Sequence, residues 1–347
     1  MTAMNPRKRF PSVPALLGAL FFLSLPPAPA GEAPVSLAGE WKFELDPQDV
    51  GAGEGWFNKD LGGSIELPGT ITTNKLGNPI SAIRQQIWGG DFTDQPLWHP
   101  MLRYDFRGNA WYQTTVDIPQ EWSGQSVELF LERVCWVSEA WLDGKSSGVA
   151  DSLTAPHRHV FGPVKPGKHR LTVRIDNRQL HDLGCNTHSY HEQSCTIYNG
   201  VVGKIELRAT PLVSVKSNQV YPDARTGQVE MRLSLANATG KAQETTITTG
   251  VRADGGKEAL ARETRTVTLQ PGETRLTIPL KLQADVVKLW SEFERPLYQA
   301  RVEIKSAAGT DTRDDRFGFR EFKGEGPRFT INGHPVLLRG EANNAQF

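Results

Sequence analysis

The stretch "SVELFLERV" (residues 126–134) places Val127, Leu129 and Leu131 on one side of an extended chain. Because successive side chains of a strand point to opposite faces, this spacing predicts a half-buried β-strand. Similar short alternating runs, separated by turn residues, continue from residue 36 to 325, whereas helical periodicity is nearly absent. The sequence therefore predicts an all-β protein built from sandwiches.

The turns between these runs are predicted from their glycines and prolines. The stretch "HRLTVRI" (169–175) repeats the alternation, and "LDGK" (142–145) predicts a tight turn because glycine supplies a positive φ. The stretch "RTVTLQPGETRLTIPL" (265–280) predicts a hairpin across Pro271 and Gly272. One short helical turn is expected at "AIRQQIW" (82–88).

The first 30 residues form a separate unit. A basic segment, Arg7–Arg9, precedes the apolar run "VPALLGALFFLSL" and the small residues "APA" that end at Ala30. This order is typical of a secretory signal peptide, and the apolar run is shorter than the roughly 20 residues that a membrane anchor needs. We therefore expect an exported protein in the bacterial periplasm or outside the cell, with no membrane contact after signal removal.

The charge of the chain is balanced, with 39 Lys and Arg against 39 Asp and Glu. Neither a basic stripe nor a basic amphipathic helix is visible in the sequence. The composition thus argues against a nucleic-acid partner or an anionic membrane surface. An uncharged or weakly charged partner is expected.

The sequence predicts three structural segments after residue 30. A change of composition near Pro211 separates residues 31–211 from a second series of strands at residues 212–325. The stretch "KGEGP" reads as a Gly/Pro linker, and residues 326–347 end with "FTINGHPVLLRGEANNAQF". The apolar run Val336–Leu338 in it lacks alternation, which predicts a strand buried on both faces.

A series of motifs carries a resemblance to glycoside hydrolase family 2, the β-galactosidase, β-glucuronidase and β-mannosidase group. Each motif is weak alone, but the eight follow the order of that family over residues 36–347. They are "LAGEWKF", "AWYQTTVDIP", "LFLERVCWVSEAWLDGKSSG", "PGKHRLTVRIDN", "YNGVVGKIEL", "LWSEFERPLY", "FGFRE" and "INGHPVLLRG".

This resemblance implies a jelly-roll sugar-binding domain at residues 31–211 and an immunoglobulin-like sandwich at residues 212–325. Residues 326–347 would then be a linker and the first strand, a stub, of a (β/α)8 barrel. In the family the two catalytic glutamates lie in that barrel, which takes about 250 residues. We therefore expect no catalytic residue here and a chain that is inactive alone, with carbohydrate as its partner.

Two alternatives to a non-catalytic front half remain open. In the first, the chain is a stand-alone carbohydrate-binding module. In the second, it is half of a split glycosidase that a separate barrel-containing chain completes. An apolar strand at Val336–Leu338 with nothing to bury it argues against the stand-alone module, because exposed strands promote aggregation.

The loop "DNRQLHDLGCNTHSYHEQSCTIYNG" (176–200) is the most polar and His-rich part of the first domain. The resemblance implies that it reaches the sugar pocket, although Gln193-Ser194 replaces the acidic residue usual in the family. The amide, imidazole and carboxylate groups suited to sugar hydroxyls belong to Asn177, His188, Glu192, Gln193 and Asn199. Bracing of a long loop is the competing interpretation of these side chains.

The cysteines of an exported chain allow two interpretations. Cys185 and Cys195 form a disulfide in the loop while Cys135 lies in an apolar strand, or all three are buried thiols. A zinc site with His188 and His191 is disfavoured because the ligands lack the two separated pairs of structural zinc sites. We expect no metal and no cofactor.

The aromatic residues Trp111 and Trp141 lie in alternating strand patterns and are expected in the core. Trp88 and Trp98, in a loop-rich stretch, are expected to be more exposed. The triplet "HRH" at His157–His159 is compatible with metal binding or with an exposed turn.

Overall fold

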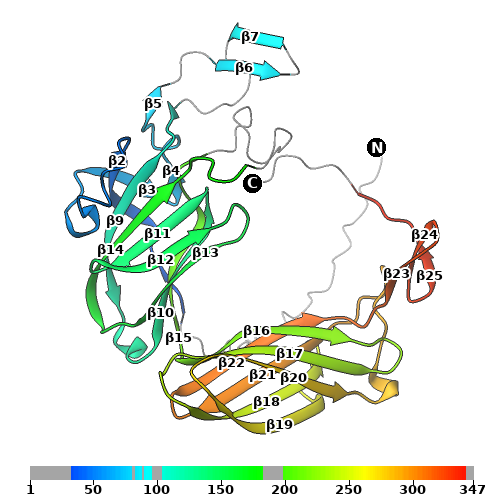
Figure 1. Cartoon of the computed structure of the whole chain (residues 1–347). Helices are drawn as coiled ribbons and strands as arrows, with labels where there is room; N and C mark the ends of the chain where they lie inside the picture. Colours follow the sequence, from blue (N-terminus) through cyan, green and yellow to red (C-terminus); the bar gives the residue numbers. More distant parts are fainter. Residues whose placement is uncertain (1–32, 80–82, 88–89, 96–103, 183–197, 341–347) are drawn as a thin grey trace, which may run out of the picture.

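The computed structural model describes residues 33–79, 83–87, 90–95, 104–182 and 198–340. These form two β-sandwiches, a three-stranded sheet and two two-stranded sheets (Figure 1). The described regular elements are strands, apart from three short 3-10 helices: η1 (Trp56–Asn58), η2 (Gln120–Trp122) and η3 (Ala284–Val286). The predicted all-β class is confirmed. In the described part of the chain, no helix is long and apolar enough to cross a membrane.

The first sandwich consists of a five-stranded and a six-stranded sheet. The five-stranded sheet has the order β1-β15-β10-β13, with β4 also paired to β15, and the six-stranded sheet has the order β12-β11-β14-β9-β2-β3. Their bounds are β1 (Val35–Ser36), β2 (Gly39–Asp46), β3 (Gly63–Leu67), β4 (Gly69–Thr70), β9 (Asn109–Ile118), β10 (Ser126–Val134), β11 (Val137–Leu142), β12 (Lys145–Asp151), β13 (His157–Pro163), β14 (Gly167–Asp176) and β15 (Gly200–Thr210).

The core of this sandwich lies between its two sheets, as the alternation predicts. Val127, Leu129 and Leu131 of β10 are fully buried, and so are the alternating apolar residues of β14. Phe130 points to the other face of β10 but is also buried, because the guanidinium carbon of Arg208 lies 3.5 Å from its ring centroid. Both faces of this strand are therefore covered.

One predicted turn is confirmed and one is wrong. Asp143 and Gly144 join β11 to β12 with positive φ angles of 49° and 78°, as in type I′ hairpins. The described residues of the expected helical turn, 83–87, instead form strand β6, which pairs antiparallel with β7. The small strands here are β5 (Asn78–Pro79), β6 (Ile83–Ile87), β7 (Gly90–Gln95) and β8 (Tyr104–Asp105).

The second sandwich has the seven strands that its length suggests. A three-stranded sheet of order β16-β17-β20 faces a four-stranded sheet of order β19-β18-β21-β22. A separate apolar cluster, from Val213 to Phe319, fills the space between them. The bounds are β16 (Val213–Pro222), β17 (Gln228–Asn237), β18 (Gln243–Ala253), β19 (Ala259–Leu269), β20 (Gly272–Lys281), β21 (Tyr298–Ser306) and β22 (Gly309–Phe317).

The predicted hairpin across Pro271 and Gly272 is wrong. The chain does reverse there, but β19 pairs with β18 whereas β20 pairs with β17, in the facing sheet. Turn residues specify that the chain reverses and not which sheet the next strand joins. Pro271–Gly272 therefore connects the two layers of the sandwich.

The last described sheet corrects two expectations. The "KGEGP" stretch, expected as a linker, forms β23 (Phe322–Glu325) and a two-residue turn at Gly326–Pro327 that leads into β24 (Arg328–Ile331). The third strand, β25 (His334–Val336), ends before Leu337 and Leu338, whose exposed fractions are 78% and 57%. Leu337 and Leu338 therefore do not belong to a strand, and no described segment covers them.

Candidate carbohydrate-binding site

Both ends of the long loop between β14 and β15 are hydrogen-bonded to the backbone of one residue, Gly108. Asn177 directly follows β14, and its Oδ1 accepts a hydrogen bond from the N–H of Gly108 at 3.0 Å. Asn199 directly precedes β15, and its Nδ2 donates to the carbonyl of the same Gly108 at 3.1 Å. The two ends of the loop are therefore fixed to each other and to the start of β9.

The Asn199 amide makes two further hydrogen bonds in this bracing. Its Nδ2 also donates to the Ile175 carbonyl at 3.1 Å, and its Oδ1 accepts from the Tyr112 hydroxyl at 2.6 Å. Burial raises the pKa of Tyr112 well above its usual value, so this hydroxyl stays a donor. Asn177 donates in turn to the Phe106 carbonyl at 2.8 Å. Both predicted site asparagines thus direct their amides at protein groups, as the bracing interpretation has it.

The first residues of the loop extend this anchor with ion pairs. The Arg178 guanidinium lies 2.5 Å from the Asp176 carboxylate and 3.1 Å from that of Asp49. These hydrogen bonds, first of all the one with Asp176, raise the pKa of Arg178. The direction of the chain as it leaves β14 is therefore fixed by charge as well as by the Asn177 amide.

A second polar group lies beside the loop on β12. The Asp151 carboxylate accepts a hydrogen bond from Trp136 Nε1 at 2.8 Å and contacts His181 Nε2 at 2.7 Å. The hydrogen bond with His181 lowers the pKa of Asp151, and the His181 ring packs 5.5 Å from the Trp136 ring. The Trp136 ring therefore lies beside both the Asp151 carboxylate and the His181 imidazole.

The other predicted loop residues lie outside the described residues. This applies to the candidate sugar ligands His188, Glu192 and Gln193, to the cysteines Cys185 and Cys195, and to Trp88 and Trp98. Cys135 is buried between β10 and β11 rather than inside a strand. Among the described residues, no cluster of His, Cys, Asp and Glu side chains has the composition of a metal site.

The histidines of "HRH" lie neither at an exposed turn nor in a metal cluster of the described residues. His157 and His159 are buried on β13, because both contact the Ser138 hydroxyl, at 2.6 and 2.8 Å. His157 Nε2 faces the Ser152 carbonyl at 2.9 Å, and His159 Nδ1 lies 3.0 Å from the Ser147 hydroxyl. Burial lowers the pKa of both rings, to about 4 for His159.

The expectation that Trp111 and Trp141 belong to the core is confirmed. Trp111 is fully buried, and its ring stacks 5.3 Å from that of Trp141, which stacks in turn on Phe57. Trp111 Nε1 donates to the buried Asp46 carboxylate at 3.1 Å. These rings hold the loop after β2 against the sheet.

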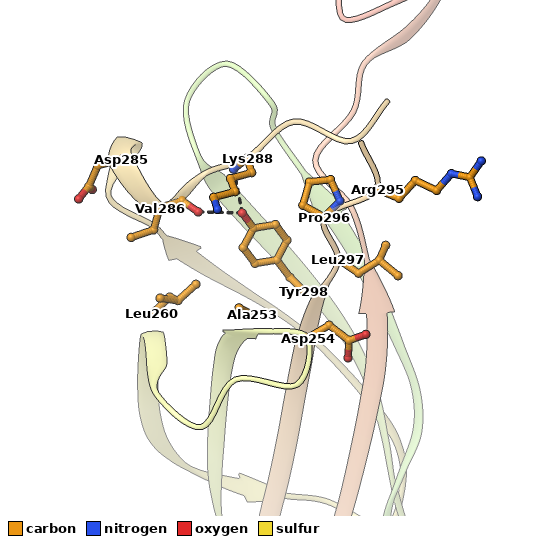
Figure 2. Close-up of a pocket in the computed structure, with 10 residues that line it drawn as sticks. All are labelled: Ala253, Asp254, Leu260, Asp285, Val286, Lys288, Arg295, Pro296, Leu297 and Tyr298. Carbon is orange, nitrogen blue, oxygen red and sulfur yellow. Dashed lines mark hydrogen bonds between the residues drawn. The ribbon is translucent and has the colours of Figure 1, made fainter. Parts of the chain in front are cut away.

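An open pocket of about 560 Å³ lies in the second sandwich (Figure 2). The Tyr298 hydroxyl donates to the Val286 carbonyl at 2.7 Å and accepts from the Lys288 N–H at 2.8 Å. Figure 2 shows Asp254 and Asp285 on opposite sides of Tyr298.

Both sandwiches match models of known protein families. The model described as the sugar binding domain of glycosyl hydrolases family 2 matches residues 35–211, and a second model of glycosyl hydrolases family 2 matches residues 213–320. The first match alone spans the whole of the first sandwich and more than half of the chain. The chain belongs to glycosyl hydrolases family 2.

Relatives of this family 2 chain include β-glucuronidases. A β-glucuronidase of Paenibacillus borealis is 22% identical over 333 residues, which are 88% of this chain and 48% of that protein. The β-glucuronidase of Ruminococcus gnavus in complex with D-glucuronic acid matches with a TM-score of 0.63 at 20% identity, and the match covers 91% of this chain and 51% of that chain. For a β-glucuronidase of Bacteroides uniformis the TM-score is 0.66 at 16% identity, covering 89% and 35%. The family 2 chain thus spans about half the length of the curated relative that it matches.

Proposed function

We propose that this chain is the sugar-binding and sandwich portion of an exported family 2 β-glycosidase that acts on β-glucuronides. It contributes carbohydrate contacts and does not cleave glycosidic bonds alone. The observation that carries this proposal is the match of both sandwiches to β-glucuronidases, of which the chain spans about half.

The anchored loop assigns a function to the asparagines within this proposal. Asn177 and Asn199 are positioning residues, because their amides are directed at Gly108 and neighbouring backbone groups. The sugar contacts then fall to loop residues between them, for which His188, Glu192 and Gln193 are the candidates.

Chromogenic glycosides test the proposal directly. The purified chain is incubated with p-nitrophenyl β-D-glucuronide, β-D-galactoside and β-D-mannoside, and release of nitrophenol is followed. We expect no turnover above the rate in buffer, because the residues that match the family carry neither of its barrel glutamates. Turnover that follows the chain through two unrelated purification schemes would overturn the proposal.

An exposed apolar surface is compatible with the split glycosidase, the second candidate function. The rings of Phe322 and Phe329 stack at 5.4 Å on β23 and β24, and each is nearly half exposed. Leu337 and Leu338 are more exposed still. An exposed apolar surface of this kind suits a covering domain, in the same polypeptide or in a separate chain.

The coding sequence beyond the Phe347 codon separates these arrangements. A barrel-coding frame that continues without interruption supports one polypeptide, and a barrel frame with its own start supports two chains. For two chains, co-expression should yield a complex that hydrolyses the glucuronide. The double variant Phe322→Ser and Phe329→Ser should weaken that complex, whereas Thr248→Ser in the second sandwich should not.

A further inference from the structure

A glycine occupies the middle of a central strand in the second sandwich. Gly250 of β18 lies opposite Arg262 of β19 on one side and opposite Arg301 of β21 on the other. Neighbouring strands are about 4.8 Å apart, so the two arginine backbones are about 10 Å apart with no side chain between them. Two cations therefore flank one open position on the sheet.

The local backbone does not demand glycine at this position. Gly250 has no left-handed φ, and a Cβ there would meet one neighbouring atom, the Ala261 carbonyl oxygen, at 3.3 Å. A glycine inside a strand costs about 0.5–1 kcal/mol of stability relative to alanine. Such a glycine marks a bulge or a place where a ligand approaches the backbone. Gly250 itself is in regular register, with the bulge between Val251 and Arg252.

A hollow of about 220 Å³ lies over this position. Four basic side chains and one carboxylate are among its lining residues: Arg252, Lys257, Arg262, Arg301 and Glu303. The Thr248 hydroxyl also lines it and lies 3.2 Å from the Thr264 hydroxyl of the next strand. The volume is below the roughly 300 Å³ of the smallest drug-sized sites, which suits a single sugar unit.

The positive charge of the hollow is only partly compensated. Arg301 pairs with Asp314 at 2.9 Å, and Glu303 pairs with Lys305 at 2.8 Å. Within the described part of the chain, Lys257 and Arg262 form no ion pair within 4.0 Å. The charges of Arg301 and Arg262 nevertheless add to the Lys305 hydrogen bond in lowering the pKa of Glu303. Like charges gathered in this way repel one another unless an anion lies between them. The net charge of the whole chain does not reveal this local excess of positive charge, because basic and acidic residues are equal in number.

We propose that the hollow over Gly250 binds the carboxylate of an acidic monosaccharide unit, with Arg262 and Arg301 as its two clamps. Arginine forks match the two oxygens of a carboxylate, and the Thr248 hydroxyl can accept and donate hydrogen bonds to sugar hydroxyls. The choice of a uronic acid over other carboxylates rests on the proposed function. The site itself rests on the cross-strand register and the charges around Gly250.

Binding to the purified chain tests the site without any glycosidase activity. Titration with D-glucuronate, D-glucose and inorganic sulfate is followed by NMR chemical shifts or calorimetry at low and physiological salt. D-glucuronate should bind at least ten-fold more tightly than either of the others, with a Kd that rises with salt. Arg262→Ala and Gly250→Val should each weaken binding at least ten-fold. Arg275→Ala, an exposed arginine on the opposite sheet, should leave it unchanged.

Three results would overturn the proposal: equal affinity for glucose, equal affinity for sulfate, or a Kd unchanged in Arg262→Ala. Arg262 is exposed, so its removal leaves the sandwich core intact. If Gly250→Val fails to fold, Gly250→Ser fills the same position with a smaller side chain. Failure of glucuronide turnover in a barrel-containing complex would count against the proposed function alone, because this binding is measured on the sandwiches.

Discussion

The two sandwiches use buried asparagines in different ways. In the first, Asn199 bonds to Tyr112, Gly108 and Ile175, which are 87, 91 and 24 residues away along the chain. In the second, Asn237 bonds to Thr239, Lys241 and Leu269, at separations of 2, 4 and 32 residues. Asn199 thus connects distant segments of the first sandwich, whereas Asn237 mainly braces a local turn of the second. The long-range amide contact of the second sandwich is that of Asn218 with Asp315, 97 residues away.

The largest expected effect comes from Asn199→Ala in the first sandwich. The change leaves the Tyr112 hydroxyl and two buried carbonyls without this partner, so the free energy of unfolding should fall by about 3–5 kcal/mol. Denaturant unfolding measures the loss, and hydrogen-exchange mass spectrometry locates it. Faster exchange should appear in β9, β14 and β15 and not in β16 to β22. Equal loss of protection in both sandwiches would break the comparison.

Acid should reveal a second difference, since the two histidines that are buried among the described residues, His157 and His159, belong to the first sandwich. Burial lowers the pKa of His159 to about 4, whereas histidine in an unfolded chain titrates near 6.5. The unfolded chain therefore binds a proton that the native chain excludes. This contribution to stability is complete above about pH 6.5 and is lost as the pH falls toward 4, by about 3 kcal/mol.

Urea unfolding of the wild type at several pH values from 7 to 4 measures this loss. The variant His159→Gln should have a flatter stability profile, and His334→Gln, exposed on β25, should follow the wild type. A wild-type stability that does not change between pH 6.5 and 4.5 would contradict the assignment.

The counterpart change in the second sandwich, Asn237→Ala, should have a smaller and more local effect. The Leu269 and Lys241 carbonyls lose their amide donor, which should cost about 2 kcal/mol because the turn can be reached by water. Hydrogen exchange should accelerate around residues 237–243 alone. If this variant destabilises the chain as much as Asn199→Ala, the contrast between the sandwiches is wrong.

The smallest expected effect sharpens the comparison at the surface. Arg208→Ala removes the guanidinium that covers Phe130, and such a contact contributes about 1 kcal/mol. Arg275→Ala, whose side chain is 84% exposed in the second sandwich, should change stability by less than about 0.5 kcal/mol. Thermal unfolding of both variants under one buffer condition measures the difference, and equal melting temperatures would remove it.

The sequence predicts strand faces well where side chains alternate. Val127, Leu129 and Leu131 are buried as their spacing requires, because a period of two leaves one choice of face. The predicted Pro271–Gly272 hairpin failed for a different reason. A turn motif is local, whereas the choice of β17 over β19 as partner of β20 depends on packing across the whole sandwich.

Polar residues are the part of the site that sequence patterns do not resolve. Asn199 can bind a sugar hydroxyl or a backbone carbonyl with the same groups, and only its distance from Gly108 distinguishes them. The buried His157 and His159 pair escaped prediction because its partner, Ser138, is on another strand. The arginines beside Gly250 depend on strand register, which the sequence alone does not supply.

The layer-crossing connection at Pro271–Gly272 has a consequence for how the second sandwich folds. Strands β18 and β19 are neighbours in sequence and can associate early, at a low entropic cost of loop closure. Strand β20 must instead reach β17 past both of them, and non-local pairings of this kind slow folding. Until residue 281 has been synthesised, a nascent chain would therefore expose the edge of β17 that later pairs with β20.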